Sequence, residues 1–367
     1  MRIVHYKSHI LAICVFAALT VACTADVSSE TQAVPNEPVV TEPVTEDGKL
    51  RTVPFLTVRN KTGTDKAAEY FGGERSSLQA GICELLRTQY DSLKTIKENV
   101  PFYIPDEIVK LDAVVELSVE DFWRRFERTS NSQAPVMYMH GFYISFDRGC
   151  RRAVLLKESL DLSGRFVHFS WPSDGSILNY TQDEADLYWS VGPLRELLAD
   201  MIQRFGVGNA NVIAHSLGTR GVMLALVLMA QGQQDNEPLL NHVVLIAPDI
   251  DVGIFKQYVP MIRPLARTMT VYVSSNDSPL ALSRQVHGHP RLGEAGEHLE
   301  GLTDIEIIDL SDMPITVPSG HLYHLYDNQV INDLSQLINE NKPAAQRRDL
   351  KKISQNYWRL QQIDSDK

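Results

Sequence analysis

The chain has 367 residues, of which 46 are acidic and 35 basic, giving a formal net charge of -11, and 44% of its residues are hydrophobic. That hydrophobic fraction is enough for a buried core, which excludes a wholly disordered protein. The acidic balance argues against a nucleic-acid-binding protein, because such a protein presents a basic face to the phosphates.

The first 22 residues are typical of an export signal. Arg2 and Lys7 precede an apolar run over residues 10–22. This run is shorter than the roughly 20 residues that cross a bilayer. We therefore predict a signal peptide rather than a permanent transmembrane helix.

Cys23 directly follows the apolar run, and the junction "VAC" resembles the lipobox of bacterial lipoproteins, in which the cysteine is lipidated and becomes the new N-terminus. Thr20 departs from that pattern, and cleavage after Ala25 is the alternative. We expect lipidation of Cys23, which would hold the exported protein on a bacterial envelope membrane, facing the periplasm. Cleavage after Ala25 would instead leave a secreted or periplasmic protein.

Residues 23–49 are rich in proline, threonine, valine and acidic residues and contain no aromatic residue. Such a segment buries too little surface to offset its ordering entropy, so it predicts a flexible tether. Residues 50–340 are then expected to form one α/β domain. In its first part, "LRTVPFLTV" and "LDAVVELS" are strand-like, and a short helix is predicted to begin after a Ser118 cap.

From residue 135 onward, near-continuous apolar runs alternate with helical stretches. This alternation predicts a buried, mostly parallel sheet with helices on both faces, whose core spans residues 135–340. The apolar runs are residues 136–140, 166–171, 211–214, 243–247, 269–275 and 304–310.

Three further expectations concern helices. Thr181 and Glu184 form a candidate capping box for a helix reaching Phe205, which Pro193 should kink or split. The stretch "GVMLALVLMAQG" is apolar nearly all round and should form a buried helix. The polar residues 341–367 are expected to be a tail or a peripheral helix.

The stretch "AHSLG" places Ser216 between a predicted strand and a predicted buried helix. This is the context of a nucleophile elbow, in which the residues two before and two after the serine must be small. Ala214 and Gly218 meet that condition. The alternative is a serine that only caps the helix.

A catalytic serine needs a histidine and a carboxylate after it in the chain. Asp277 follows the apolar run 269–275, and Asp249, after the run before it, is the alternative acid. His321 and His324 are both candidates for the base. Oxyanion stabilisation requires two N–H donors. We assign them to the amides of Leu217, which follows the serine, and of Phe142 in "HGF".

The chain from Val136 to about Leu334 resembles the α/β-hydrolase superfamily, and within it a bacterial family labelled as a domain of unknown function. The resemblance rests on "HGF", "FSWPS", "AHSLGTR", "APD", "SSND" and "GHLYH" in this order. It implies a central sheet of about eight mostly parallel strands, with the segment from about residue 50 adding the early ones. The pattern Gly320-His321, followed by Asp333, implies His321 as the base, and the resemblance implies Asp277 as the acid.

Weaker expectations concern several other side chains. Arg220 is expected to pair with a carboxylate, and Trp171 either lines a substrate pocket or packs under the following loop. Cys83 and Cys150 are either a disulfide or two separate thiols. No metal or other cofactor is expected, because the histidines "HGH" at 287–289, His298, His321 and His324 lack the accompanying motifs of a metal site.

Together these features predict a serine hydrolase that acts on a small-molecule or lipid carboxylic ester through an acyl-enzyme. Two alternatives remain at this stage. One is a non-catalytic envelope binding protein on the same fold, and the other is an acyltransferase that uses the same residues.

Overall fold

The computed structural model describes residues 50–87, 109–129, 133–162, 164–176, 179–233, 237–314 and 320–362. The predicted signal peptide and the whole of the predicted tether, including Cys23, lie outside these residues. No helix within the described ranges is long and apolar enough to cross a membrane.

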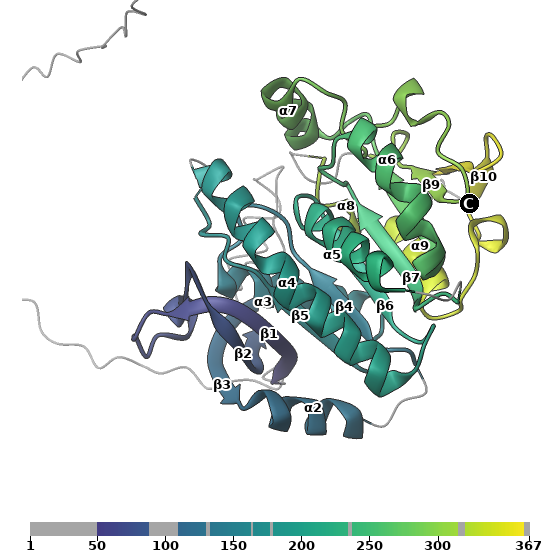
Figure 1. Cartoon of the computed structure of the whole chain (residues 1–367). Coiled ribbons are helices and arrows are strands. Elements are labelled where there is room, and N and C mark those ends of the chain that lie inside the picture. Colours follow the sequence, from purple (N-terminus) through teal and green to yellow (C-terminus); the bar gives the residue numbers. More distant parts are fainter. Residues whose placement is uncertain are drawn as a thin grey trace, which may run out of the picture. The chain divides into compact units, whose positions relative to one another are not determined.

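A single sheet of eleven strands forms the centre of the described chain (Figure 1). Its order is β10-β11-β9-β8-β7-β6-β4-β5-β1-β2-β3. The strands are β1 (Arg51–Lys61), β2 (Phe71–Arg87), β3 (Val109–Leu117), β4 (Val136–Met139), β5 (Phe166–Ser170), β6 (Asn211–His215), β7 (Leu240–Ile246), β8 (Ala266–Val273), β9 (Glu306–Asp309), β10 (Leu350–Lys352) and β11 (Tyr357–Leu360). Neighbours from β11 to β1 pair in parallel, which confirms the mostly parallel sheet.

The prediction of about eight strands is wrong, because β2, β3 and β10 add antiparallel pairings at the two edges. The expected tail or helix over residues 341–367 is wrong as well, since β10 and β11 lie there. Both the edge strand β10 and its neighbour β11 are short and carry basic residues, as is typical of a protected sheet edge. Such strands lack the apolar run that identifies a central strand.

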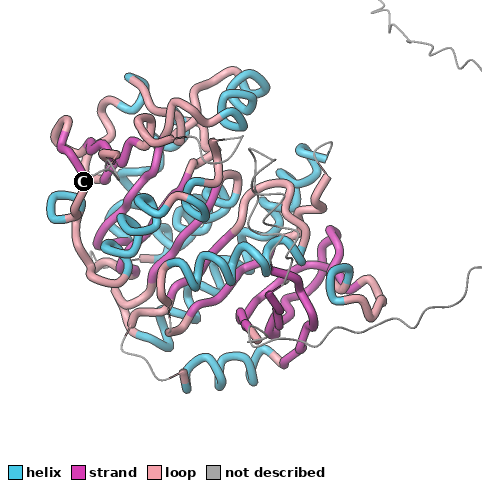
Figure 2. Tube along the Cα trace, turned by 180° about the vertical axis from the view of Figure 1, so that it is seen from behind, coloured by secondary structure: helices cyan, strands magenta, loops and turns pink. Residues whose placement is uncertain are grey.

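Helices cover both faces of the sheet, as predicted (Figures 1 and 2). One apolar cluster joins the sheet to α2, α4, α5 and α6, and a second joins it to α3, α8 and α9. The helices are α2 (Val119–Arg128), α3 (Phe146–Ser159), α4 (Tyr180–Phe205), α5 (Gly218–Gly232), α6 (Val252–Ile262), α7 (Ser278–His287), α8 (Tyr323–Tyr326) and α9 (Asn328–Ile338).

The helix starts differ from expectation in one place. Ser118 caps α2 as predicted, by accepting a hydrogen bond from the Asp121 amide. The capping box at Thr181 is not formed, because α4 already begins at Tyr180. Pro193 lies inside α4 without splitting it, so one continuous helix packs along the sheet.

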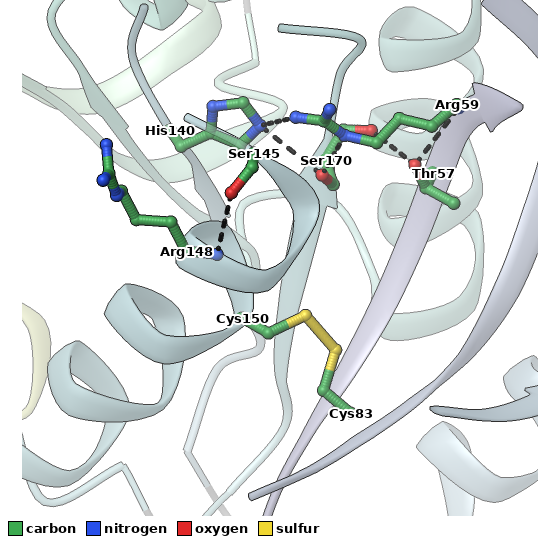
Figure 3. The surroundings of a disulfide bond; sticks show 8 residues. All are labelled: Thr57, Arg59, Cys83, His140, Ser145, Arg148, Cys150 and Ser170. Atoms are coloured by element: carbon green, nitrogen blue, oxygen red, sulfur yellow. Dashed lines mark hydrogen bonds between the residues drawn. A yellow bond between two sulfur atoms is a disulfide. The ribbon is translucent and has the colours of Figure 1, made fainter. Parts of the chain in front are cut away.

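Cys83 in β2 and Cys150 in α3 form a disulfide, which decides the alternative that the sequence left open (Figure 3). The bond links residues 67 positions apart in the chain. It therefore ties the antiparallel edge of the sheet to the helix that follows the "HGF" loop.

Candidate active site

Ser216 lies in a sharp turn between β6 and α5. Its φ of 52° is in the left-handed region, which residues other than glycine rarely adopt. The Ser216 amide donates to the Ile246 carbonyl of the neighbouring strand at 2.9 Å, which helps to hold this conformation. The N-cap position of α5 belongs to Leu217, so helix capping does not explain the serine.

Two glycines allow the loop after β4 to approach this turn. A Cβ atom on Gly218 would lie 2.3 Å from the His140 carbonyl oxygen. A Cβ atom on Gly141 would lie 2.8 Å from the Ser216 Cβ atom. Both contacts are impossible for a larger residue, so the small residues of "AHSLG" and "HGF" permit one packed unit around Ser216.

His321 and Asp277 are in direct contact. The His321 Nδ1 atom lies 2.7 Å from Asp277 Oδ2, and the Asp277 side chain is fully buried. An ionised carboxylate only accepts hydrogen bonds, so the proton of a neutral His321 ring is on Nδ1. The Nε2 atom of that ring can then accept a proton. The other oxygen, Oδ1, accepts from the Leu280 amide at 3.0 Å. Asp277 therefore orients the histidine and also caps α7.

The loop that carries His321 is held by two contacts that the sequence did not reveal. A Cβ atom on Gly320 would lie 2.3 Å from the Asn276 carbonyl oxygen, so the loop closely approaches the residue before Asp277. His215, directly before Ser216, donates from Nε2 to the His321 carbonyl at 3.0 Å. Burial lowers the pKa of His215 well below the usual value, which keeps it neutral.

Ser216 and His321 line the same cavity. Within the described chain, the His321 ring bonds to Asp277 and not to Ser216. Catalytic hydrogen bonds are often long in ligand-free sites and shorten when the substrate binds. The cavity volume is about 680 Å³, which is within the range of sites that enclose an organic ligand.

The two assigned oxyanion donors belong to residues close to the serine in the chain or in the cavity. Leu217 follows it in the chain, and Phe142 lines the same cavity. Neither backbone N–H donates to an acceptor among the described residues. Free amides beside a nucleophile are the groups that stabilise a developing oxyanion.

The alternative acid, Asp249, is engaged elsewhere. It accepts hydrogen bonds from Arg291 and Ser283 at 2.7 Å and from Tyr180 at 2.9 Å. Burial alone would raise its pKa, but Arg291 and Arg220 lower it below the usual value. These contacts do not include either candidate histidine, so Asp249 anchors the surrounding loops.

The alternative base, His324, is fully buried, and neither ring nitrogen has a partner within the described chain. Its ring lies 4.5 Å from that of His215, measured between centroids, and it does not line the cavity. The histidines His287 and His298 contact backbone carbonyls instead of each other. No group of three side chains suited to a metal ion occurs among the described residues.

Two weaker expectations are also decided. Arg220 forms an ion pair with Glu184 and donates to the Asp249 carbonyl, as the predicted pairing with a carboxylate requires. Trp171 is fully buried and donates from Nε1 to the His140 carbonyl at 2.9 Å. It therefore supports the "HGF" loop and does not line the cavity.

Arg59 of β1 was not predicted to belong to the site. Only 1% of its surface is exposed. Its guanidinium donates to the carbonyls of Ile144 at 2.7 Å and Ser173 at 2.6 Å. It also donates to the Ser170 hydroxyl at 2.8 Å (Figure 3). Burial lowers the Arg59 pKa to about 9. The residue joins the loops that follow β4 and β5, and its partner Ile144 lies two residues after Phe142 in the chain.

Asp183 completes this network from α4. It accepts hydrogen bonds from the Ser173 hydroxyl and from the Asp174 amide. Burial raises its pKa to about 6. An arginine in a strand is usually solvent-facing, and no sequence signal marked Arg59 as buried.

Five buried histidines whose pKa is lowered by burial predict that acid destabilises the fold. They are His140, His168, His215, His242 and His324. Burial lowers each pKa from 6.5, so the unfolded chain is protonated first and stability is lost as pH falls below about 6.5. Each contributes up to about 1.4 kcal/mol per pH unit. The buried carboxyls of Asp183 and Asp333, with pKa values raised to about 6, partly oppose this loss.

We therefore expect the free energy of unfolding in urea to be lower at pH 5.5 than at pH 7.5, by a few kcal/mol. Chemical denaturation at the two pH values measures the difference. Equal or greater stability at pH 5.5 would contradict the neutral state assigned to these histidines.

Comparison with known proteins gives one family and several distant structures. No curated protein matches the chain. An esterase from Pyrobaculum calidifontis is similar at 13% identity and a TM-score of 0.32, over 58% of this chain and 78% of the other. The carboxylesterase CesB from Bacillus subtilis is similar at 12% identity and a TM-score of 0.30, over 59% and 87%.

The family model described as alpha/beta hydrolase of unknown function (DUF900) matches residues 118–340, which is more than half of the chain. The match includes Ser216, Asp277 and His321. It begins after Arg59, so β1 supplies a contact to the site from outside the matched region. The resemblance inferred from the motifs is confirmed, and the chain belongs to this family of alpha/beta hydrolases.

Proposed function

We propose that this hydrolase is a serine enzyme that cleaves carboxylic esters through an acyl-enzyme on Ser216. The observation that carries the proposal is the His321–Asp277 pair, whose histidine lines one cavity with a serine in a left-handed turn. His–Asp hydrogen bonds occur in many proteins, but here the histidine lines the same cavity as a candidate nucleophile, and its Nε2 atom has no hydrogen-bond partner among the described residues. That combination favours catalysis over a binding function.

In the proposed mechanism, the Ser216 Oγ atom attacks the ester carbonyl carbon while His321 Nε2 takes the hydroxyl proton. The Leu217 and Phe142 amides donate to the carbonyl oxygen as it becomes negative. Collapse of the intermediate breaks the bond to the alcohol oxygen, which receives the proton from His321. Water then attacks the acyl-enzyme by the same route and releases the acid.

A fluorophosphonate probe tests the nucleophile directly. We expect one covalent adduct, located on Ser216 by peptide mass spectrometry, and none on Ser216→Ala or on the heat-denatured protein. A folded wild-type protein that is not labelled would favour the binding-protein alternative. Turnover that requires an added alcohol acceptor, with little hydrolysis in water, would favour the acyltransferase.

We further propose that the enzyme is exported and held on a bacterial envelope membrane through a lipidated Cys23. The disulfide between Cys83 and Cys150 supports an oxidising compartment. Metabolic labelling with palmitate should mark the wild-type protein and leave Cys23→Ser unlabelled. An unlabelled wild-type protein in a purified membrane-free fraction would instead support cleavage after Ala25.

Arg59 gives a prediction about the oxyanion loop. Arg59→Met leaves the Ile144 and Ser173 carbonyls without their donor, so the Phe142 amide should lose its alignment. We expect kcat for an ester to fall by up to about two orders of magnitude, as for loss of one oxyanion donor, with a smaller change in KM.

Arg75→Met is the matched control, because Arg75 also lies in a strand of this edge but is paired with Asp186 outside the cavity. Steady-state kinetics on both folded variants make the comparison. An unchanged kcat in Arg59→Met would show that the loop does not need this residue.

A further inference from the structure

Helix α7 forms a wall of the candidate cavity and presents apolar side chains to solvent. Leu282 is 58% exposed and Val286 is 69% exposed, and these are the two most exposed large hydrophobic residues of the described chain. They lie four positions apart, so they share one face of the helix. Both also line the cavity that contains Ser216.

The opposite face of α7 is firmly packed. Leu280 is 1% exposed, Ser283 donates to Asp249 at 2.7 Å, and Asp277 caps the first turn. The exposure of Leu282 and Val286 is therefore not a consequence of a loosely attached helix. A surface helix normally carries polar side chains on such a face. The helix also has no acidic residue.

Other apolar side chains continue this wall toward the nucleophile. Phe142, Tyr143 and Ile144 line the cavity from the "HGF" loop, and Leu322 lines it beside His321. Tyr143 is itself 39% exposed. An apolar surface thus extends from the reacting groups to the outside of the protein. A two-carbon acyl group would occupy only a small part of a cavity of about 680 Å³.

We infer that this cavity is the binding site for a medium to long unbranched alkyl chain of the ester substrate. The inference depends on the proposed esterase function and names its substrate class. Carbons near the ester contact the loop after β4, and the distal methylenes contact Leu282 and Val286. Each methylene that moves from water onto this apolar wall stabilises the bound substrate and transition state by about 0.8 kcal/mol. This corresponds to about a fourfold gain in kcat/KM.

Two series of soluble esters test the inference and identify which part of the substrate carries the chain. The first series contains methyl esters from acetate to octanoate, and the second contains acetates of alcohols from methanol to octanol. All are used below their solubility limits. We expect kcat/KM to rise by about fourfold per methylene in one series until the chain passes Val286. A rise in the first series places the chain on the acyl side, and a rise in the second places it on the alcohol side.

The variant Leu282→Ser/Val286→Ser should lower kcat/KM for the longest esters by about tenfold more than it does for methyl acetate, which lacks the chain that would contact these residues. Val286→Ser alone should give part of the effect, and its high exposure makes a folding defect avoidable. Leu228→Ser is the matched control, because Leu228 is 42% exposed but does not line the cavity. It should behave as the wild-type protein.

The outcomes separate this inference from the proposed function. An active enzyme whose kcat/KM is flat or falls with chain length in both series overturns the alkyl-chain site and leaves the esterase proposal intact. An equal loss for methyl acetate and the octyl esters in the double variant also overturns it. Hydrolysis that persists in folded Ser216→Ala, or none for any ester, would refute the esterase proposal itself.

Discussion

Ser216→Ala is expected to lower kcat/KM for an accepted ester by about four to six orders of magnitude. The reason is that no other side chain is proposed to form the acyl-enzyme, so the variant keeps only substrate binding and the oxyanion donors. Ser216 is 8% exposed and its hydroxyl is not needed to cap α5. The fold should therefore tolerate alanine, and hydrolysis of a chromogenic ester at high enzyme concentration measures the residual rate.

His321→Ala provides the companion measurement. The two residues act on the same proton, so we expect a loss of similar size in each variant and little further loss in the double variant. Circular dichroism confirms that each protein is folded. If the fold losses in kcat/KM of the two single variants instead multiplied in the double variant, Ser216 and His321 would act in separate steps.

Much of the candidate site was predictable because its residues follow apolar strands. Ser216 and Asp277 come just after β6 and β8, and the carboxyl ends of parallel strands meet at one edge of the sheet. His321 precedes α9, and its position was inferred from the motif with Gly320. The structure adds the physical reason for that glycine, which is its close approach to the Asn276 carbonyl.

The features that the sequence did not predict lie at the sheet edges or depend on partners far away in the chain. β2, β10 and β11 are edge or near-edge strands whose exposed polar residues hide the strand pattern. Arg59 is buried although its residue type is usually exposed, because two of the carbonyls that accept from it, those of Ile144 and Ser173, come from loops more than 80 residues away. Local periodicity contains no information on such distant partners.

The fold class was easier to predict than the number of strands for the same reason. Eight neighbouring strands, from β11 to β1, pair in parallel, and seven of these correspond to strand-like or apolar segments recognised in the sequence. The eighth, β11, is only four residues long and pairs with β9 near the C-terminal end of the chain. Its strand state depends on that pairing and not on its own sequence.

The two candidate acids should respond to the same substitution in opposite ways. Asp277→Asn keeps an oxygen to cap α7 but replaces the acceptor of the His321 Nδ1 proton with an amide. The ring then favours the wrong tautomer, and we expect kcat to fall by about four orders of magnitude with a small change in thermal stability.

Asp249→Asn is the matched control, since both carboxylates are buried at the same edge of the sheet. Asp249→Asn removes the negative charge that pairs with Arg291. Because the buried Arg291 charge then has no carboxylate partner, we expect a loss of about 3–5 kcal/mol in the free energy of unfolding. The folded fraction should keep a kcat within about tenfold of the wild-type value, because Asp249 does not contact His321. Parallel measurement of kcat and of unfolding in urea separates the two effects. A large loss of kcat in stable, folded Asp249→Asn, with near-normal activity in Asp277→Asn, would reverse the assignment of the acid.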